Sequence, residues 1–324
     1  MKVYDLKELG TNEISFYLAL EKYLVKEKKL DDCFFLWEID KSIIIGKNQV
    51  LKKEVNIDFT REIGAKIYRR PSGGGGIYAD SGCFMYSFIV RAETKDDAYN
   101  KTLPKLVKIL KDLGVDASFS GRNDLLFRDK KFSGCAIYYL DNVIILHGTF
   151  MYDTNIENLV RALTPNKEKL ISKGIESVKS RVINLKPYLK IDKNELMDYI
   201  IHNISDENTL LKLEKEEIDD VLEMKKGFDD YNYIYLNDPK YTYFKKKRFN
   251  FGEIELRIDV ARGKIKDINF MGDFFLCGEL GEYLDKFKGA LFDIDKIKDI
   301  INQNDVSKYI VDCKNSDIID LLGE

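Results

Sequence analysis

The sequence predicts an α+β fold followed by a smaller domain of helices and strands. Short apolar runs of strand character gather between residues 34 and 152, whereas residues 155–230 show helical periodicity. After about residue 240, apolar and polar positions alternate around a turn signal. The chain has 324 residues, 44% hydrophobic and 12% aromatic, which is enough for two domains with their own cores. We therefore expect domains over residues 1–245 and 250–324, with the boundary near 235–248.

The first part of the chain predicts a helix, several strands and a second helix. Thr11 is a suitable N-cap for a helix to about Lys28. Its apolar face would carry Phe16, Tyr17, Leu20, Tyr23 and Leu24. Short apolar runs predict strands at 34–38, 42–46, 65–70 and 83–91. A helix over 96–113 would stop at Gly114, and Pro104 must lie early in it or kink it.

The remaining elements follow from turn signals and periodicity. Residues 116–152 again have strand character, with Asp141-Asn142 as a tight turn. Amphipathic stretches predict helices over Asn155–Leu163, Lys193–Asn203 and Lys215–Lys226. A hairpin is predicted around Ala261-Arg262-Gly263, between runs at 252–260 and 264–271. Helical segments near 279–289 and 294–302 are expected to close the chain.

Charge and cysteine usage exclude several classes of protein. The chain has 52 basic and 55 acidic residues, so it lacks the basic footprint of a nucleic-acid-binding protein. No apolar run approaches the length of a membrane span, and the N-terminus has no apolar signal-peptide core. The cysteines lack the CxxC spacing of zinc sites; they are Cys33, Cys83, Cys135, Cys277 and Cys313. We expect a cytoplasmic monomer with reduced thiols and no nucleic-acid or membrane partner.

A glycine-rich segment is the most informative feature of the sequence. It reads Arg69-Arg70-Pro71-Ser72-Gly73-Gly74-Gly75-Gly76 and leads into Ile77-Tyr78-Ala79-Asp80. Four consecutive glycines lose much backbone entropy on folding, which indicates an unusual bend or a close approach to the backbone. Arginine beside bare amides favours a phosphate or carboxylate. The alternative is a long hairpin loop.

Two further clusters carry candidate chemistry. Asn123 and Asp124 offer oxygen atoms of the kind that hold magnesium beside a nucleotide. Lys131, seven residues later, is a compact charge that suits a phosphate, although a lysine is often only a solvated surface charge. For Asp124, a turn residue is the alternative interpretation. His147 precedes Gly148-Thr149 at a strand end, where a buried, hydrogen-bonded histidine is the alternative to a site residue.

Taken together, the motifs resemble the lipoate–protein ligase family. The matching segments are Arg69-Arg70-Pro71-Ser72-Gly73-Gly74-Gly75 with Asp80 and Gly82, Gly121-Arg122-Asn123-Asp124, Lys131-Phe132-Ser133-Gly134, His147-Gly148-Thr149, and Lys169-Leu170-Ile171-Ser172-Lys173-Gly174-Ile175 leading into Ser177-Val178-Lys179-Ser180-Arg181-Val182-Ile183-Asn184-Leu185. Their order and spacing agree with the family, so the resemblance covers about residues 1–245. Residues 252–324 look like the accessory C-terminal domain of full-length members.

The resemblance implies a fold and a reaction. The fold is a mixed β-sheet flanked by helices, related to biotin ligases and class II aminoacyl-tRNA synthetases. ATP and lipoate, with Mg²⁺, give lipoyl-adenylate, and the lipoyl group then passes to a lysine of a lipoyl carrier domain. The carriers would be the E2 subunit of 2-oxoacid dehydrogenases or the glycine-cleavage H protein.

The resemblance also implies roles for individual residues. Lys131 would be catalytic, bridging the adenylate phosphate and the carbonyl oxygen. Asp124 would hold magnesium. Substrate and adenylate contacts would come from Arg70, Ser72, Gly73, Gly74, Gly75, Gly76, Ile77, Tyr78, Asp80, Cys83, Asn123, Asp124, Ser133, Gly134, His147 and Thr149.

Some features depart from the family pattern or leave alternatives open. Ala79 stands where many members have histidine, and Cys83 where asparagine is common. Cys83 and Cys135 invite comparison with relatives that use cysteine in octanoyl transfer, although two buried thiols would look the same. An ATP-independent octanoyl or lipoyl transferase is the same-fold alternative, and a non-enzymatic binder of lipoylated partners is another. The C-terminal segment favours the ligase, because transferases generally lack it.

The region around the expected domain boundary carries two more hypotheses. The basic run at 245–248 would either steer an acidic carrier domain or protect an edge strand. The polar run Asn237-Asp238-Pro239-Lys240 is a candidate hinge. Closure of the C-terminal domain would then shield the reactive adenylate from water.

Overall fold

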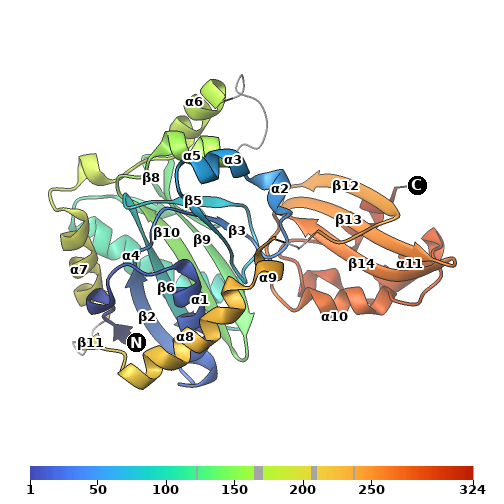
Figure 1. Cartoon of the computed structure of the whole chain (residues 1–324), viewed down its shortest axis with the longest axis horizontal. Helices are drawn as coiled ribbons and strands as arrows, with labels where there is room; N and C mark the ends of the chain where they lie inside the picture. The colour runs from blue at the N-terminus through green and yellow to red at the C-terminus, as the bar shows by residue number, and fades with distance from the viewer. Residues whose placement is uncertain (122, 164–170, 206–209, 236–237, 324) are drawn as a thin grey trace.

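The computed structural model describes the chain except for residues 122, 164–170, 206–209, 236–237 and 324, and it leaves the side chains of 171–174 undescribed. Arg122 and Lys169-Leu170 of the matched motifs therefore lie outside the described residues. The N-terminal three-quarters of the chain surrounds a large sheet, and the last quarter forms a smaller lobe beside it (Figure 1). The expected mixed sheet flanked by helices, with an additional C-terminal unit, is confirmed.

The large sheet has eight strands among the described residues, in the order β11-β1-β2-β6-β10-β9-β8-β7. Strand β1 pairs in parallel with β11 and β2, and every other pair is antiparallel. The strands are β1 (Lys2–Tyr4), β2 (Asp32–Trp37), β6 (Cys83–Val90), β7 (Ala117–Phe119), β8 (Asp124–Phe127), β9 (Lys130–Leu140), β10 (Val143–Met151) and β11 (Leu210–Leu211). The turn at Asp141 has φ 51°, and Leu140 pairs with Val143, as the sequence predicts.

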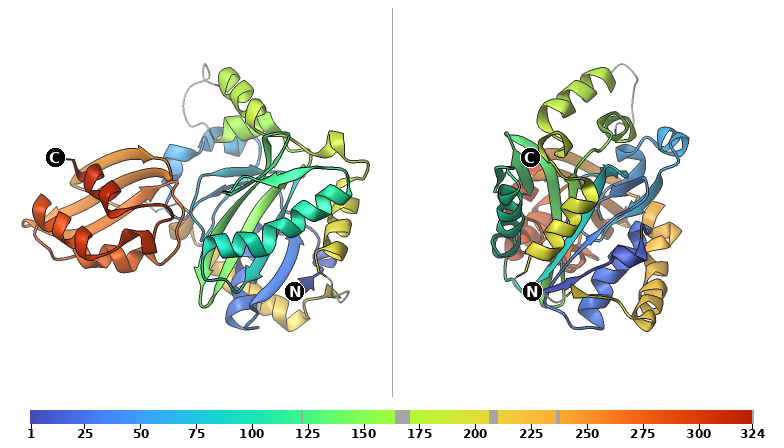
Figure 2. Two further views of the ribbon diagram at one scale, coloured as in Figure 1. Left: turned by 180° about the vertical axis from the view of Figure 1, so that it is seen from behind. Right: turned by 90° about the vertical axis from the view of Figure 1, so that its left-hand side faces the viewer.

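Helices cover both faces of this sheet (Figures 1 and 2). Helices α1 (Ile14–Lys26) and α8 (Lys215–Asp229) pack on one face, and α4 (Lys95–Asp112) and α7 (Lys193–Asn203) pack on the other. The central strands are apolar on both faces because alternate side chains point to opposite cores. On β6, Phe84, Tyr86 and Phe88 join the α4 core, whereas Met85 and Ile89 join the α1 core. Among the described helices, none is long and apolar enough to cross a membrane.

A second, three-stranded sheet, in the order β4-β3-β5, supports the glycine-rich segment. Its strands are β3 (Ser42–Ile45), β4 (Lys66–Arg69) and β5 (Ile77–Ala79), and it packs with α2 (Leu51–Glu54), α3 (Ile57–Glu62) and α5 (Ile156–Ala162). The glycine-rich segment connects β4 to β5, both of which pair with β3. Both ends of the loop are therefore fixed by the same strand.

The C-terminal lobe places helices on a three-stranded antiparallel sheet. Its elements are β12 (Tyr243–Phe249), β13 (Gly252–Ala261), β14 (Lys264–Gly272), α10 (Leu280–Leu284), α11 (Ile294–Gln303) and α12 (Asn315–Leu322). The predicted hairpin is confirmed, since Arg262 and Gly263 both have positive φ, at 52° and 72°. The expectation that helices at 279–289 and 294–302 close the chain is wrong, because α12 follows them.

Short elements complete the described chain. They are α6 (Ile171–Arg181), α9 (Tyr231–Tyr235) and the 3-10 helices η1 (Lys7–Leu9), η3 (Lys186–Tyr188), η4 (Asp285–Phe287) and η5 (Val306–Lys308). Thr11 does not cap the first helix, because Asn12 pairs with Ile39 in a β-bridge and α1 begins only after Glu13. Pro104 lies in the middle of α4 rather than near its start.

The smaller lobe rests on the larger one at the glycine-rich segment and at α2. The amide of Gly74 donates to the carbonyl of Phe274 at 3.0 Å, and the amide of Gly272 donates to Asn48 at 2.9 Å. The Lys53 ammonium on α2 lies 2.7 Å from the carboxylate of Glu255 on β13. The expected catalytic loop thus forms part of the contact between the lobes.

Two glycines should respond oppositely to alanine. A Cβ at Gly82 would lie 2.0 Å from the backbone oxygen of Asp153, so Gly82→Ala should destabilise the protein by about 1–3 kcal/mol or more. Gly227, exposed inside α8, has open space around it, so Gly227→Ala should stabilise by about 0.5–1 kcal/mol. Urea unfolding measures both changes, and equal effects at the two positions would contradict the packing around Gly82.

Candidate functional site

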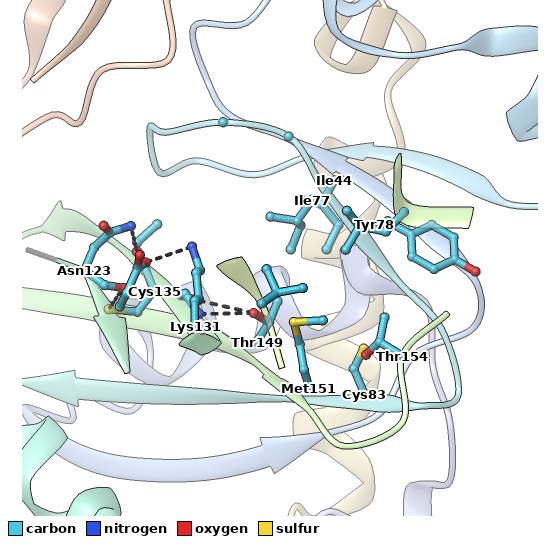
Figure 3. Close-up of a pocket in the computed structure, with 18 of the residues that line it drawn as sticks. Ile44, Ile77, Tyr78, Cys83, Asn123, Lys131, Cys135, Thr149, Met151 and Thr154 are labelled. Atoms are coloured by element: carbon cyan, nitrogen blue, oxygen red, sulfur yellow. Dashed lines mark hydrogen bonds and ion pairs between the residues drawn. The ribbon is translucent and has the colours of Figure 1, made fainter. Parts of the chain in front are cut away.

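A cavity of about 580 Å³ opens between the large sheet, the small sheet and α6. Figure 3 shows Asn123 and Lys131 toward one end, and Met151 and Cys83 toward the other. Apolar side chains from five elements line the rest of the wall: Ile14, Leu18, Trp37, Ile44, Met85 and Met151. The cavity therefore suits an elongated ligand with an apolar part and an anionic part.

Arg70 braces the glycine-rich segment from inside. Its guanidinium donates to the carbonyls of Gly73 and Gly75 at 2.6 and 2.8 Å, to Ile44 O at 3.3 Å, and through Nε to the Ser72 hydroxyl at 3.0 Å. Each of these acceptors is a neutral oxygen. Within the described part of the chain, no salt bridge balances the charge of Arg70, which is only 6% exposed. Burial lowers the pKa of Arg70 to about 10, so it remains charged at neutral pH.

The neighbouring Arg69 has a structural role. It donates to the carbonyls of Gly46, Lys47 and Gln49 before α2, and to those of Tyr233 and Ile234 on α9. Burial lowers its pKa to about 10 as well. Arg69 thus ties the segment before α2 to α9, and it does not line the cavity. Two buried positive charges thus lie side by side in the sequence beneath the loop.

The glycines meet two different constraints. A Cβ at Gly73 would lie 2.5 Å from the carbonyl oxygen of Phe274 in the C-terminal lobe. Gly74 has φ 87°, and a Cβ there would lie 2.6 Å from the Phe275 ring, which itself lines the cavity. Gly75 is exposed with nothing within 4 Å of a Cβ. Gly73 and Gly74 therefore allow the C-terminal lobe to approach the loop closely, whereas Gly75 and Gly76 line the cavity.

Lys131 lies across a glycine at the polar end of the cavity. A Cβ at Gly134 would lie 2.5 Å from the end of the Lys131 side chain, so the lysine could not keep this position beside any other residue. Lys131 Nζ lies 2.7 Å from Asp124 Oδ1. Asp124 Oδ1 is therefore ion-paired with Lys131, but it accepts no well-aligned hydrogen bond from any described residue. The Lys131 carbonyl accepts the amide of Ile183 at 2.9 Å, which fixes the base of the lysine to the matched segment after α6.

The structure brings most of the predicted site residues to the cavity. Those that line it are Arg70, Gly75, Gly76, Ile77, Tyr78, Cys83, Asn123, Asp124, Lys131, Gly134, His147 and Thr149. Those that lie outside its lining are Ser72, Gly73, Gly74, Asp80 and Ser133. Asp80 holds the amides of Gly82 and Asn155, and Ser133 bonds to the Tyr86 hydroxyl at 3.0 Å. Their contact with a ligand stays a prediction.

Behind the loop, a buried polar chain connects Ser72 to α1. The Ser72 hydroxyl lies 2.7 Å from His147 Nε2, and His147 Nδ1 lies 3.0 Å from the carboxylate of Glu21. The Ser87 hydroxyl donates to Glu21 at 2.6 Å, and the indole of Trp37 donates to Ser87 at 3.0 Å. The histidine is thus both a cavity residue and a hydrogen-bonded buried one. Sequence reasoning missed Glu21, because nothing local distinguishes it from a solvated helix position.

Other cavity residues were also missed. The apolar lining comes from elements far apart in the sequence, and no spacing connects them. Arg181, the last residue of α6 and part of a matched segment, lines the cavity, and Phe275 enters from the C-terminal lobe. Arg181 could have been identified as a cavity residue because it lies in a matched segment. Phe275 lies in no matched motif, so nothing in the sequence pointed to it.

The cysteines near the cavity are buried thiols. Burial raises the pKa of both Cys83 and Cys135 to about 12. Cys135 Sγ donates to the carbonyl of Asn123 at 3.2 Å, and Cys83 Sγ to that of Asp80 at 3.3 Å. Both thiols therefore lack the lowered pKa of a nucleophilic cysteine.

The basic run at 245–248 lies on β12, an edge strand of the C-terminal sheet. Three of its four charges pair with acidic groups of the same lobe: Lys246 with Glu253, Lys247 with Asp320 and Arg248 with Asp273. This pairing supports the edge-protection interpretation over the steering of a partner.

Family comparisons cover most of the chain. The family described as lipoyl protein ligase A/B catalytic domain matches residues 13–205, and the bacterial lipoate protein ligase C-terminus matches residues 238–322. The chain is 33% identical to lipoate-protein ligase LplJ of Bacillus subtilis, over 96% of this chain and 97% of that relative.

Solved structures share the fold. A P. falciparum LipL1 structure in complex with lipoate superposes with a TM-score of 0.79 at 22% identity, covering 96% of each chain. A lipoate-protein ligase A structure bound with ATP superposes with a TM-score of 0.60 at 18% identity, covering 72% of this chain and 97% of that one.

Alkylation tests the state of the thiols. The raised pKa values leave little thiolate at pH 8, so iodoacetamide should modify Cys83 and Cys135 at least about tenfold more slowly than the partly exposed Cys277, whose pKa is about 11. Mass spectrometry of native and urea-unfolded protein measures the rates. Rapid native modification of either buried thiol would instead indicate a nucleophile of the octanoyl-transferring kind.

Proposed function

The chain belongs to the lipoate–protein ligase family, and we propose that its cavity joins lipoate to ATP and then passes the lipoyl group to a lysine of a lipoyl carrier domain. One observation carries the proposal: buried Arg70 and half-exposed Lys131 place positive charge on a cavity that is otherwise largely apolar. Its volume, about 580 Å³, lies within the range of small-molecule sites. Relatives of this fold that hold lipoate or ATP support this choice of ligands.

The charge arrangement suits the first half-reaction. A carboxylate oxygen of lipoate attacks the α-phosphorus of ATP, and the bond to the β-phosphate breaks to release pyrophosphate. Two anions must approach, and the charges of Arg70 and Lys131 offset their repulsion. The amides of Gly75 and Gly76 donate no hydrogen bond within the described part of the chain, so they are available to the adenylate.

Lys131 has a second task in acyl transfer. The carrier amine attacks the carbonyl carbon of lipoyl-adenylate, the carbon–oxygen bond to the phosphate breaks, and AMP leaves as the amine loses a proton. Negative charge grows on the carbonyl oxygen and on the departing phosphate, where an ammonium stabilises it. No covalent enzyme nucleophile is needed, in keeping with the buried, protonated thiols.

Magnesium fits the polar end as a nucleotide-bound ion. Among the described residues, no three His, Cys, Asp or Glu side chains gather as metal ligands. Mg²⁺ beside a nucleotide takes most of its ligands from phosphates and water, and it needs only one or two carboxylates. Asp124, whose Oδ1 is buried with unused acceptor capacity, would hold it, and Asp129 lines the same cavity.

The remaining parts of the proposal concern the setting of the reaction. The carrier would be an E2 subunit of a 2-oxoacid dehydrogenase or a glycine-cleavage H protein, and the enzyme would act as a cytoplasmic monomer. All five cysteines are free thiols, which supports a reducing compartment. We keep as proposals the division into residues 1–245 and 250–324 and the hinge at 237–240, of which Asn237 lies outside the described residues. Residues 243–245, which open β12, pair with β13 of the C-terminal sheet.

Lipoate-dependent exchange between ATP and pyrophosphate tests the activity. The ligase exchanges labelled pyrophosphate into ATP only when lipoate and magnesium are both present. Absence of exchange by protein that still transfers octanoyl groups between carriers would favour the ATP-independent transferase.

Replacement of the bridging lysine should separate chemistry from folding. Lys131→Ala should lower the exchange rate by about a hundredfold to a thousandfold, because a donor to the developing charge is lost. Stability should change by about 1 kcal/mol at most, since the side chain is 37% exposed. Lys130→Ala is the matched control, because the partly exposed Lys130 side chain donates to the Lys179 carbonyl and does not line the cavity. Unchanged exchange in Lys131→Ala would remove this lysine from the mechanism.

Asp124→Asn should change the magnesium requirement. With one carboxylate lost, the magnesium concentration for half-maximal exchange should rise by about tenfold or more. The exposed Asp116 lies outside the cavity lining, so Asp116→Asn serves as the charge-matched control. A requirement that matches the wild type would show that Asp124 serves only to hold Lys131.

A further inference from the structure

The carboxylate of Glu21 is completely buried on α1, with 0% exposure. It accepts hydrogen bonds from the Ser87 hydroxyl at 2.6 Å and the Tyr138 hydroxyl at 3.1 Å, and it faces His147 Nδ1 at 3.0 Å. A buried carboxylate is costly unless its oxygens are well supplied with donors. Three donors from three strands converge on this one, which indicates a position held for a reason beyond packing.

The hydrogen-bond directions between Arg70 and Glu21 can be assigned by starting from Arg70. Arg70 Nε can only donate, so the Ser72 oxygen accepts from it. The hydroxyl hydrogen of Ser72 is then free to donate to His147 Nε2 at 2.7 Å. If Nε2 accepts, a neutral imidazole carries its proton on Nδ1 and donates it to Glu21. Every member of the chain is satisfied in this arrangement.

We propose that Glu21 is a positioning residue for the adenylate loop: it holds His147 in the Nδ1–H tautomer, and the ordered chain through Ser72 then orients Arg70. The Arg70 guanidinium in turn draws in the carbonyls of Gly73 and Gly75. With those carbonyls turned inward, the loop presents its amides and the buried charge to the ligand. The effect on adenylation rests on the proposed function, whereas the tautomer does not.

These hydrogen bonds also connect several residues of the cavity wall. His147 and Trp37 line the cavity, and Trp37 Nε1 donates to Ser87, which donates to Glu21. An apolar ligand against Trp37 and an anionic ligand beside Arg70 therefore act on one hydrogen-bonded chain.

Glutamine at position 21 would weaken this chain. Its amide offers one acceptor oxygen where the carboxylate offers two, and where the amide nitrogen faces His147, Nδ1 must accept and Nε2 carries the proton. Both Arg70 Nε and His147 Nε2 would then point hydrogens at Ser72, whose own hydrogen would lose its acceptor.

Nitrogen-15 NMR of the histidine rings tests the tautomer directly. The chain has two histidines, His147 and His202, and His202 lies on the surface, with Nδ1 2.7 Å from the Asp198 carbonyl oxygen. His202→Asn therefore leaves one ring to observe. Wild-type His147 should show a protonated Nδ1 and a bare Nε2, and Glu21→Gln should raise the share of rings with a protonated Nε2. A protonated Nε2 in the wild type, alone or with Nδ1, would overturn the proposal without any need for a variant that folds.

Exchange kinetics test the consequence for the loop. Glu21→Gln should lower kcat/KM for ATP by about tenfold to a hundredfold, as expected when a charged hydrogen-bond partner is lost. Ser72→Ala should cause a similar loss with the Nδ1–H tautomer kept, and the double variant should be no worse than Ser72→Ala alone. If the fold-losses in kcat/KM of the two single variants multiply in the double variant, the two residues act separately and the proposal is overturned.

A control at another buried glutamate tests whether the effects are specific to Glu21 or follow from the loss of any buried carboxylate. Glu217 on α8 is 8% exposed, and it pairs with Lys28 and with its own helix N-terminus, away from the cavity lining. Glu217→Gln should leave both the tautomer and the kinetics of exchange as in the wild type. If wild-type protein shows no lipoate-dependent exchange, the ligase proposal fails, and the NMR result alone then decides the role of Glu21.

Discussion

The site depends on a positive charge, that of Arg70, which is buried with no counter-ion among the described residues. Arg70 donates to three carbonyls and a hydroxyl, and these neutral acceptors satisfy its geometry without cancelling its charge. A desolvated cation of this kind costs free energy in the empty protein, and the depressed pKa of Arg70 reflects that cost. An anionic ligand recovers it. The loop, the small sheet beneath it and the buried chain to α1 all serve to keep this charge in place.

The glycine-rich segment contacts both Arg70 and the C-terminal lobe. On one side it wraps the Arg70 guanidinium, and on the other it receives the backbone of the C-terminal lobe at Phe274 and the ring of Phe275. A change in how that lobe is seated therefore acts on Gly73 and Gly74, which directly precede the two glycines that line the cavity. Ligand binding and the position of the C-terminal lobe therefore both act on this loop.

What the sequence could reveal was local. The helix at Lys193–Asn203 and the hairpin at Arg262-Gly263 were predicted correctly, because caps, periodicity and turn residues act over a few positions. Thr11 misled because a tertiary contact, the bridge between Asn12 and Ile39, delays the helix. The polar end of the cavity lay in contiguous motifs, whereas the apolar lining and Glu21 come from isolated positions that only the folded sheet brings together.

The chain's single tryptophan occupies an unusual position. Trp37 stacks on Tyr17 with ring centroids 4.7 Å apart, is 3% exposed, and borders the cavity while its indole N–H ends the chain from Glu21. Its emission therefore arises from one environment, and a ligand that displaces water from that wall changes both its polarity and its quenching. The protein carries an intrinsic optical probe of its own site, so ligand titrations and stopped-flow measurements need no added fluorophore.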